Sequence, residues 1–234
     1  MPRCRSGGKR AGESGAALFI LRRGAIVLLV RWAMHTRVSP FHILLLVWYI
    51  VWWSLLAIAP LDRKDWALEN VLALVLVGTL IVTHRRFRFS SLSYFLITVF
   101  MTLHAVGAHY TYAEVPVGFW LKDILSLSRN PFDRIVHFAF GFLLVYPLKE
   151  LLVRTGHVRG FWSVYLPISG TLAQSGLFEL VEALVAQLVS PDLGAAYLGT
   201  QGDEWDAQKD MAAALVGALL MTMFTRLFPQ TFRI

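Results

Sequence analysis

Two short motifs place carboxylates and a histidine at spacings that suit metal binding or proton transfer. Asp133 and His137 are four residues apart, so both side chains lie on one face of a helix. Glu179 and Glu182 are three residues apart in an apolar stretch, and neighbouring carboxylates can share a proton or bind a cation. A carboxylate beside a histidine can fix its tautomer or share a metal with it. We therefore take Asp133, Glu179 and Glu182 as candidate catalytic groups and His137 as a candidate metal ligand.

A third acidic group opens the last apolar segment of the chain. Asp203, Asp206 and Asp210 follow one another at spacings of three and four, which predicts a shared helix face. Three carboxylates on one face repel one another unless a cation or a histidine relieves the repulsion. Asp206 and Asp210 are therefore predicted as metal ligands, together with His104 and His109.

Simpler structural explanations stay open for most of these residues. Asp133 follows a turn and could cap its helix, while His137 could be a packed, hydrogen-bonded histidine. One of the two glutamates could form a structural ion pair with Arg134. Asp203 could cap the last helix, but capping does not explain Asp210, which lies two turns farther on.

Composition indicates that membrane helices position these groups. Hydrophobic residues make up 56% of the 234 residues and charged residues 16%, against about 45–50% and about 25% in soluble domains. These values exclude an ordinary soluble domain and a disordered chain. A spanning helix needs roughly 20 mostly apolar residues. The sequence predicts six spans: Phe41–Pro60, Ala67–Thr83, Leu92–His109, Arg134–Leu148, Phe161–Val189 and Asp206–Phe228. We therefore predict an all-α polytopic membrane helix bundle over residues 39–234.

Basic residues predict the orientation of this bundle. Most of the 22 lysines and arginines fall before the first span, after the second and fourth spans, and at the C-terminus. The positive-inside rule then places both termini in the cytoplasm, and an even number of spans agrees with this. On that topology, the histidines and carboxylates of spans three to six meet near the outer face. Their convergence depends on the topology.

The N-terminal region is predicted as a separate part of the chain. Residues 1–38 are rich in arginine, and Arg22 and Arg23 interrupt their apolar stretches. We predict a basic cytoplasmic tail followed by an interfacial segment over Ala16–Val38. A seventh span there stays open, although a central arginine pair is costly in hydrocarbon.

Several classes of site are excluded by what the sequence lacks. Cys4 is the single cysteine, so the chain has no intramolecular disulfide and no site built from cysteines alone. The sequence has no HExxH motif, phosphate loop, serine-hydrolase elbow or dinucleotide-binding glycine pattern. The net charge is +7, and the basic residues are concentrated on one predicted side of the membrane. We therefore expect membrane lipids as partners and no nucleic acid. The oligomeric state stays open.

A longer pattern around these residues resembles the YjdF family of bacterial inner-membrane proteins. The resemblance covers about Phe41–Phe228, and its most specific part is YLGTQGDEWDAQKDM, from Tyr197 to Met211. A weaker likeness links the Asp-Arg-x-x-His-Phe opening at Asp133 to VanZ-like membrane proteins, which are associated with glycopeptide resistance and the cell envelope. The resemblance implies a multi-pass protein of the bacterial inner membrane. It implies a fold and a location more firmly than an activity.

Three functions stay open at this point. The first is a membrane-embedded enzyme or binding site for envelope lipids, in which the predicted ligands hold a divalent cation such as zinc and Arg134 binds a lipid phosphate. The second is a small transporter or scramblase-like protein, in which Glu179, Glu182 and His137 exchange protons. The third is a structural membrane subunit, in which the polar groups join helices. The sequence decides neither between enzyme and non-enzyme nor on the cofactor.

Overall fold

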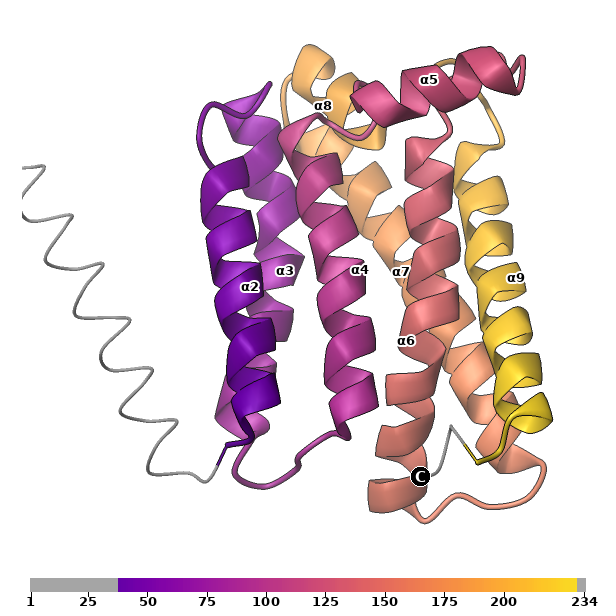
Figure 1. Cartoon of the computed structure of the whole chain (residues 1–234). Helices are drawn as coiled ribbons and strands as arrows, with labels where there is room; N and C mark the ends of the chain where they lie inside the picture. Colours follow the sequence, from indigo (N-terminus) through magenta and orange to yellow (C-terminus); the bar gives the residue numbers. More distant parts are fainter. Residues whose placement is uncertain (1–37, 231–234) are drawn as a thin grey trace, which may run out of the picture. The chain divides into compact units, whose positions relative to one another are not determined.

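The computed structural model describes residues 38–230, which form eight α-helices and no strand. The all-α prediction is therefore confirmed for this part of the chain, whereas the predicted tail and interfacial segment lie almost wholly outside it. The helices, labelled as in Figure 1, are α2 (Pro40–Leu56), α3 (Arg63–Thr83), α4 (Ser91–His109), α5 (Pro116–Ile124), α6 (Phe132–Gly156), α7 (Trp162–Leu188), α8 (Pro191–Leu198) and α9 (Asp206–Leu227).

Four of these helices are long and apolar enough to cross a membrane by length and composition: α3, α4, α6 and α9. The apolar helix α2 is shorter, at 17 residues, and α7 has 27 residues. Each of the six predicted spans overlaps one of these six helices. Large apolar side chains are widely exposed on them, for example Leu74 on α3 and Leu180 on α7. Contiguous exposed apolar surface of this kind is typical of contact with lipid.

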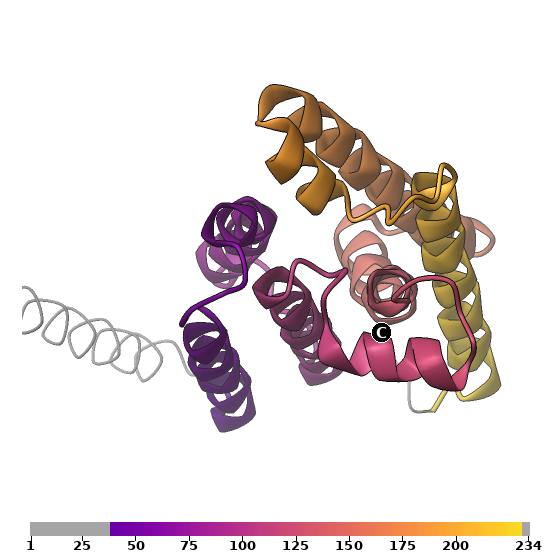
Figure 2. The same cartoon turned by 90° about the horizontal axis from the view of Figure 1, so that it is seen from above.

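Helix α6 lies at the centre of the compact unit that begins at Leu44. It packs against α4, α7 and α9, and Figure 2 shows these three helices around it. The short helices α5 and α8 lie at one end of this unit, which we call the α5/α8 end (Figure 1). The α3–α4 and α6–α7 connections lie at the opposite end.

Glycines allow α6 and α9 to approach closely. A Cβ atom on Gly141 would lie 1.8 Å from the carbonyl oxygen of Ala214, and one on Gly217 would lie 2.3 Å from that of Phe138. Small residues at helix contacts let backbones pack directly in membrane bundles. This contact sets the distance between α6 and α9, which both carry predicted site residues.

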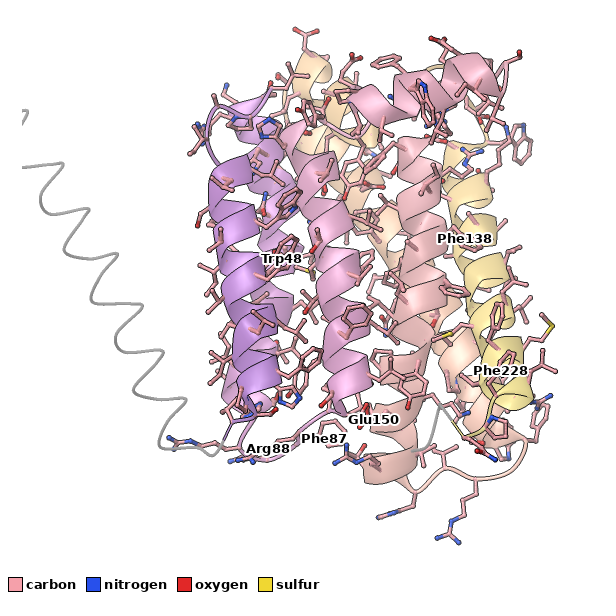
Figure 3. All side chains as sticks on the ribbon, viewed as in Figure 1. Trp48, Phe87, Arg88, Phe138, Glu150 and Phe228 are labelled. Carbon is pink, nitrogen blue, oxygen red and sulfur yellow. The ribbon has the colours of Figure 1, made fainter. Side chains whose placement is uncertain are left out.

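The opposite end is held by a network around the buried Glu150, which Figure 3 labels with Phe87 and Arg88. Its carboxylate accepts hydrogen bonds from the Ser90 backbone N–H at 2.8 Å and from the hydroxyl of Ser93. Arg154 contacts the same carboxylate, stacks on Phe87 and donates to the Arg88 carbonyl at 2.7 Å. The α3–α4 connection is thereby fixed to α6.

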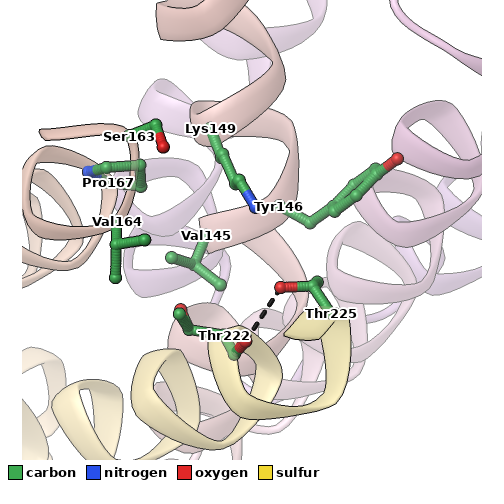
Figure 4. Close-up of a pocket in the computed structure, with 8 residues that line it drawn as sticks. All are labelled: Val145, Tyr146, Lys149, Ser163, Val164, Pro167, Thr222 and Thr225. Atoms are coloured by element: carbon green, nitrogen blue, oxygen red, sulfur yellow. Dashed lines mark hydrogen bonds between the residues drawn. The ribbon is translucent and has the colours of Figure 1, made fainter. Parts of the chain in front are cut away.

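A small cavity near this network, drawn in Figure 4, has a volume of about 10 Å³. Its walls come from α6, α7 and α9 and include Lys149, Ser163 and Thr222. A space of this size holds about one water molecule. It is too small to bind a substrate, so the candidate site lies elsewhere.

Candidate functional site

A cluster of carboxylates and one histidine lies at the α5/α8 end, between α6, α7 and α9. Asp133 is in the first turn of α6, and His137 follows one turn later on the same face. The His137 Nε2 atom lies 3.6 Å from Asp133 Oδ1 and 3.6 Å from Glu179 Oε1. One ligand atom each from Asp133, His137 and Asp210 lies within 4.8 Å of the other two. Four predicted site residues from three helices therefore converge on one point.

Glu179 is incompletely satisfied in this cluster. Its Oε1 atom is buried and makes no hydrogen bond within residues 38–230. A buried carboxylate oxygen without a partner is costly unless a proton, water or cation meets it. The oxygen lies beside the His137 ring, so this acceptor without a donor is located where the ligand atoms converge.

The capping explanation for Asp133 does not hold. The N-cap position of α6 is Pro131, and the side chain of Asn130 instead accepts a hydrogen bond from the Phe132 N–H at 3.0 Å. Asp133 is thus free to face His137. Capping also fails for Asp203, because Trp205 occupies the N-cap position of α9.

Asp206 lies beside the cluster in a different environment, between two arginines. Arg129 and Arg134 both donate to its Oδ1 atom. Arg134 also donates through Nε to Asp210 Oδ1 at 3.0 Å, and within residues 38–230 its ion pairs are with aspartates rather than glutamates. The predicted lipid-phosphate residue therefore links Asp206 to the cluster through Asp210.

Arg129 also ties two connections together. It donates to the carbonyls of Thr200 at 3.1 Å and Gly199 at 3.2 Å. Next to it, the Asn130 N–H donates to Gln201 Oε1 at 3.0 Å, and Gln201 Nε2 donates to the Asn130 carbonyl at 3.2 Å. The start of α6 and the α8–α9 connection are thus joined at the site.

Negative charge exceeds positive charge in this region. Among the described residues, this region holds six carboxyl groups, those of Asp133, Glu179, Glu182, Asp203, Asp206 and Asp210. The cationic side chains paired with them are those of Arg129, Arg134 and Lys209. The Lys209 ammonium, which hydrogen-bonds both carboxylate oxygens of Asp203, lowers the pKa of that carboxyl. Lys209 is thereby engaged at the surface, so the two arginines, a proton or a bound cation must offset the charge of the buried carboxyl groups.

The two histidines of α4 lie outside the group of converging ligand atoms. His104 Nδ1 is 2.5 Å from the Tyr112 hydroxyl, and its Nε2 is 3.2 Å from the Glu69 carbonyl. His109 Nδ1 is 2.7 Å from the Leu56 carbonyl. Hydrogen bonds within the fold engage both ring nitrogens of His104 and the Nδ1 atom of His109, and their predicted role as metal ligands stays a prediction.

Sequence analysis did not single out two buried acids of α3, Asp65 and Glu69. They are 1% and 4% exposed, and both Asp65 carboxylate oxygens and Glu69 Oε2 have no hydrogen-bond partner in the described chain. Burial raises the pKa of Tyr197 on α8, and the carboxylates of Glu69 and Glu182 raise it further. Glu69 and Glu182 thus both lie within electrostatic range of Tyr197. Asp65 and Glu69 are four residues apart at the start of an apolar helix, and this spacing could have identified them as a pair on one helix face.

Two hollows flank the start of α6. A cavity of about 310 Å³ is lined by residues of α3, α4, α6 and α7, and its lining includes Asp133, His137 and Glu182. A surface hollow of about 490 Å³ is lined by Arg129, Arg134 and other residues of the α5–α6 and α9 region. Asp133 and Arg134 are adjacent in sequence but line different hollows. The cavity reaches Asp133 and His137 of the cluster, whereas the surface hollow reaches the arginines beside it.

Comparison with known proteins assigns the family of this chain. A family model described as "Predicted membrane protein (DUF2238)" matches residues 41–230. The chain is also 40% identical over 168 residues to the inner membrane protein YjdF of Escherichia coli strain K12, which covers 71% of this chain and 80% of the relative. The chain belongs to the DUF2238 family. No solved structure matches it.

The match to DUF2238 covers every residue of the cluster and both hollows. It confirms the resemblance found in the sequence and, with the four candidate spans, a location in the bacterial inner membrane. Membership of DUF2238 carries no activity with it. The function has to be argued from the site.

Proposed function

We propose that this DUF2238 protein is a membrane-embedded, metal-dependent enzyme that acts on envelope lipids. Asp133, His137 and Asp210 hold a divalent cation in this proposal, and Glu179 completes the ligand set. The observation that carries it is the convergence of the three ligand atoms within 4.8 Å. The unpartnered Glu179 oxygen beside His137 supports it. A set of nitrogen and carboxylate ligands suits zinc, which can retain a position for water.

The residues around the cation have separate roles in this proposal. A bound divalent cation activates water and stabilises negative charge on a substrate oxygen. Glu182 lines the same cavity as Asp133 and His137, and it accepts the proton of the attacking water. The Nη1 atom of Arg134 makes no hydrogen bond to any described residue, so it can bind a substrate phosphate.

We also propose six membrane spans, formed by α2, α3, α4, α6, α7 and α9, with both termini in the cytoplasm. Arg85, Arg86, Arg154 and Arg159 lie near the end opposite α5 and α8, which supports a cytoplasmic position for that end. The α5/α8 end then faces the periplasm. The site would act on lipids of the outer leaflet.

Metal analysis of purified protein tests the proposal. We expect about one equivalent of one divalent metal in wild-type protein, the stoichiometry of a single ligand set. His137→Ala and Asp210→Asn should lose it, whereas Glu182→Gln should keep the metal and lose activity on lipid substrates. Inductively coupled plasma mass spectrometry on detergent-purified protein gives the stoichiometry, and size-exclusion chromatography confirms folding. Folded wild-type protein without metal would overturn the proposal and direct attention to proton-coupled transport through Glu179 and Glu182.

A structural role is the second candidate, supported by the ion pairs of Arg129 and Arg134 with Asp206. These pairs join the α5–α6 connection and α6 to the start of α9. In a purely structural protein, His137→Ala would reduce abundance or thermal stability without changing any metal content. The same purification therefore separates the two candidates.

A further inference from the structure

The 310 Å³ cavity has an apolar wall that the proposed chemistry does not use. Eleven of its lining residues are apolar, contributed by α3, α4, α6 and α7: Leu72, Ala73, Leu76, Phe100, Met101, Val136, Phe140, Leu144, Leu177, Phe178 and Val181. Its polar lining includes Asp133, His137 and Glu182. A mostly apolar pocket with a few converging polar groups is the usual form of a small-molecule site.

The cavity extends along α6. Its lining on α6 runs from Asp133 to Leu144, a distance of about 16 Å at 1.5 Å per residue. Its volume is near the lower limit of about 300 Å³ for ligand pockets. These proportions suit one extended, unbranched hydrocarbon chain. A lipid with two chains needs a larger volume.

Exposed residues of both α3 and α7 line the cavity, which points to a lateral opening between these helices. Leu72 of α3 and Leu177 of α7 both line it, and they are 43% and 61% exposed. These two helices are not packed against each other, although α8 packs against both. In a bilayer, exposed leucines at this position face lipid chains, so a chain can enter without passing through water.

The cavity also contains a serine hydroxyl that makes no hydrogen bond to a described residue. Ser175 is 2% exposed and lines the cavity, and its Oγ atom has no hydrogen-bond partner in the described chain. Thr171, one turn earlier on α7, instead donates to the Pro167 carbonyl at 2.8 Å. Ser175 is thus available to bond an oxygen of a bound molecule, such as an ester oxygen.

We propose that this cavity binds the single acyl chain of a monoacyl lipid phosphate, which enters from the membrane between α3 and α7. The chain lies along α6, and the phosphate reaches Asp133, His137 and their cation. The position of the lipid phosphate rests on the proposed function, whereas the position of the acyl chain rests on the cavity alone. It makes a one-chain phosphorylated amphiphile the substrate class of the site.

Photolabelling tests the chain assignment. Protein reconstituted in nanodiscs is irradiated with lysophosphatidic acid that carries a diazirine in its acyl chain, and labelled peptides are mapped by mass spectrometry. We expect adducts on cavity residues of α6 and α7, such as Leu144 and Phe178. Unlabelled lysophosphatidic acid should compete, whereas two-chain phosphatidic acid and farnesyl phosphate should not.

A matched pair of variants locates the entrance. Leu177→Trp places bulk at the opening, and Leu219→Trp makes the same change on α9, at a 49% exposed residue outside the cavity lining. Leu177→Trp should reduce cavity labelling about tenfold, the effect expected when an apolar site is overfilled. Leu219→Trp should label like wild-type protein. Both changes are at exposed residues, and size-exclusion chromatography confirms that both variants fold.

Each result decides the chain assignment separately from the metal proposal. Absence of cavity adducts, equal competition by phosphatidic acid or farnesyl phosphate, or unchanged labelling of Leu177→Trp would overturn it. Because the diazirine is on the chain, labelling of the apolar wall does not require the metal. Metal content, measured on the same samples, reports on the proposed function. Cavity labelling in protein without metal would therefore support the chain site and refute the metal-dependent enzyme.

Discussion

Arg134 binds two aspartates that differ in their other contacts. Asp210 offers a carboxylate oxygen that lies close to ligand atoms of Asp133 and His137. Asp206 instead accepts hydrogen bonds from both Arg134 and a second arginine, Arg129. A carboxylate shared by two guanidinium groups has less electron density to offer a cation. We therefore expect the two residues to respond differently to the same substitution.

Asp206→Asn should lower thermal stability and leave the metal content unchanged. The loss should be about 1.5–3 kcal/mol, because hydrogen bonds from two charged donors are weakened in a buried setting. Melting in detergent gives the stability, and mass spectrometry gives the metal. Glu204→Gln, at an exposed neighbouring position, should change neither. Loss of metal in folded Asp206→Asn protein would instead make Asp206 a ligand.

Residue spacing indicated which of these side chains lie close together. The four-residue step from Asp133 to His137 and the glutamate pair on α7 depend only on helical periodicity, and three of these residues meet. Spacing could not assign the partners of His104. Its contact with Tyr112 depends on left-handed backbone at Thr111 and Tyr112, with φ of 53° and 52°, which returns the tyrosine ring to α4.

At the scale of the helix, the pair α6 and α9 determines whether the cluster forms. Asp133 and His137 are on α6 and Asp210 is on α9, so a shift between the two helices moves ligand atoms apart. The contact at Gly141 and Gly217 leaves no room for a side chain. These glycines are therefore part of the site, although they lie outside the cluster.

Gly141→Ala should destabilise the bundle by about 1–3 kcal/mol or more, since the added methyl group meets rigid backbone of α9. Thermal melting and the yield of monodisperse protein measure the effect. Gly78→Ala on α3 is the control, because a Cβ there has no atom within 4 Å. It should be neutral or slightly stabilising through helix propensity. Equal stability of both variants would show that α6 and α9 pack less closely than described.

Hydrophobicity predicted helix positions better than helix ends. The fourth predicted span stops at Leu148, but α6 continues to Gly156. Lys149 and Glu150 resemble the end of a membrane segment in a one-dimensional scan. In three dimensions, Ser90, Ser93 and Arg154 satisfy Glu150, so the helix can continue. The short helices α5 and α8 were not predicted because they have too few residues for periodicity to reveal them.

At the scale of the whole molecule, the position of the site relative to the membrane follows from the topology. If the α5/α8 end faces the periplasm, Lys122 of α5 and Asp192 of α8 are outside the cell membrane, and Arg159 is inside. The single natural cysteine makes this simple to measure, because Cys4→Ser removes the background.

Single cysteines in the Cys4→Ser protein test the six-span topology. A membrane-impermeant maleimide applied to spheroplasts should label Lys122→Cys and Asp192→Cys, because both positions are expected at the periplasmic face. Arg159→Cys should react only after the membrane is permeabilised. The reverse pattern would place the cluster at the cytoplasmic face and change the leaflet from which lipid is taken.

The bonds between the start of α6 and the α8–α9 connection have a consequence for how the site operates over time. Arg129, Asn130 and Gln201 join the two segments through four hydrogen bonds. A connection bound in this way cannot lift as a lid while the helices stay in place. Opening of this connection would require the four hydrogen bonds to break or α6 and α9 to move apart. If the proposed lipid chemistry takes place here, exchange of substrate would have to occur laterally from the membrane, with the cluster held in position between one substrate and the next.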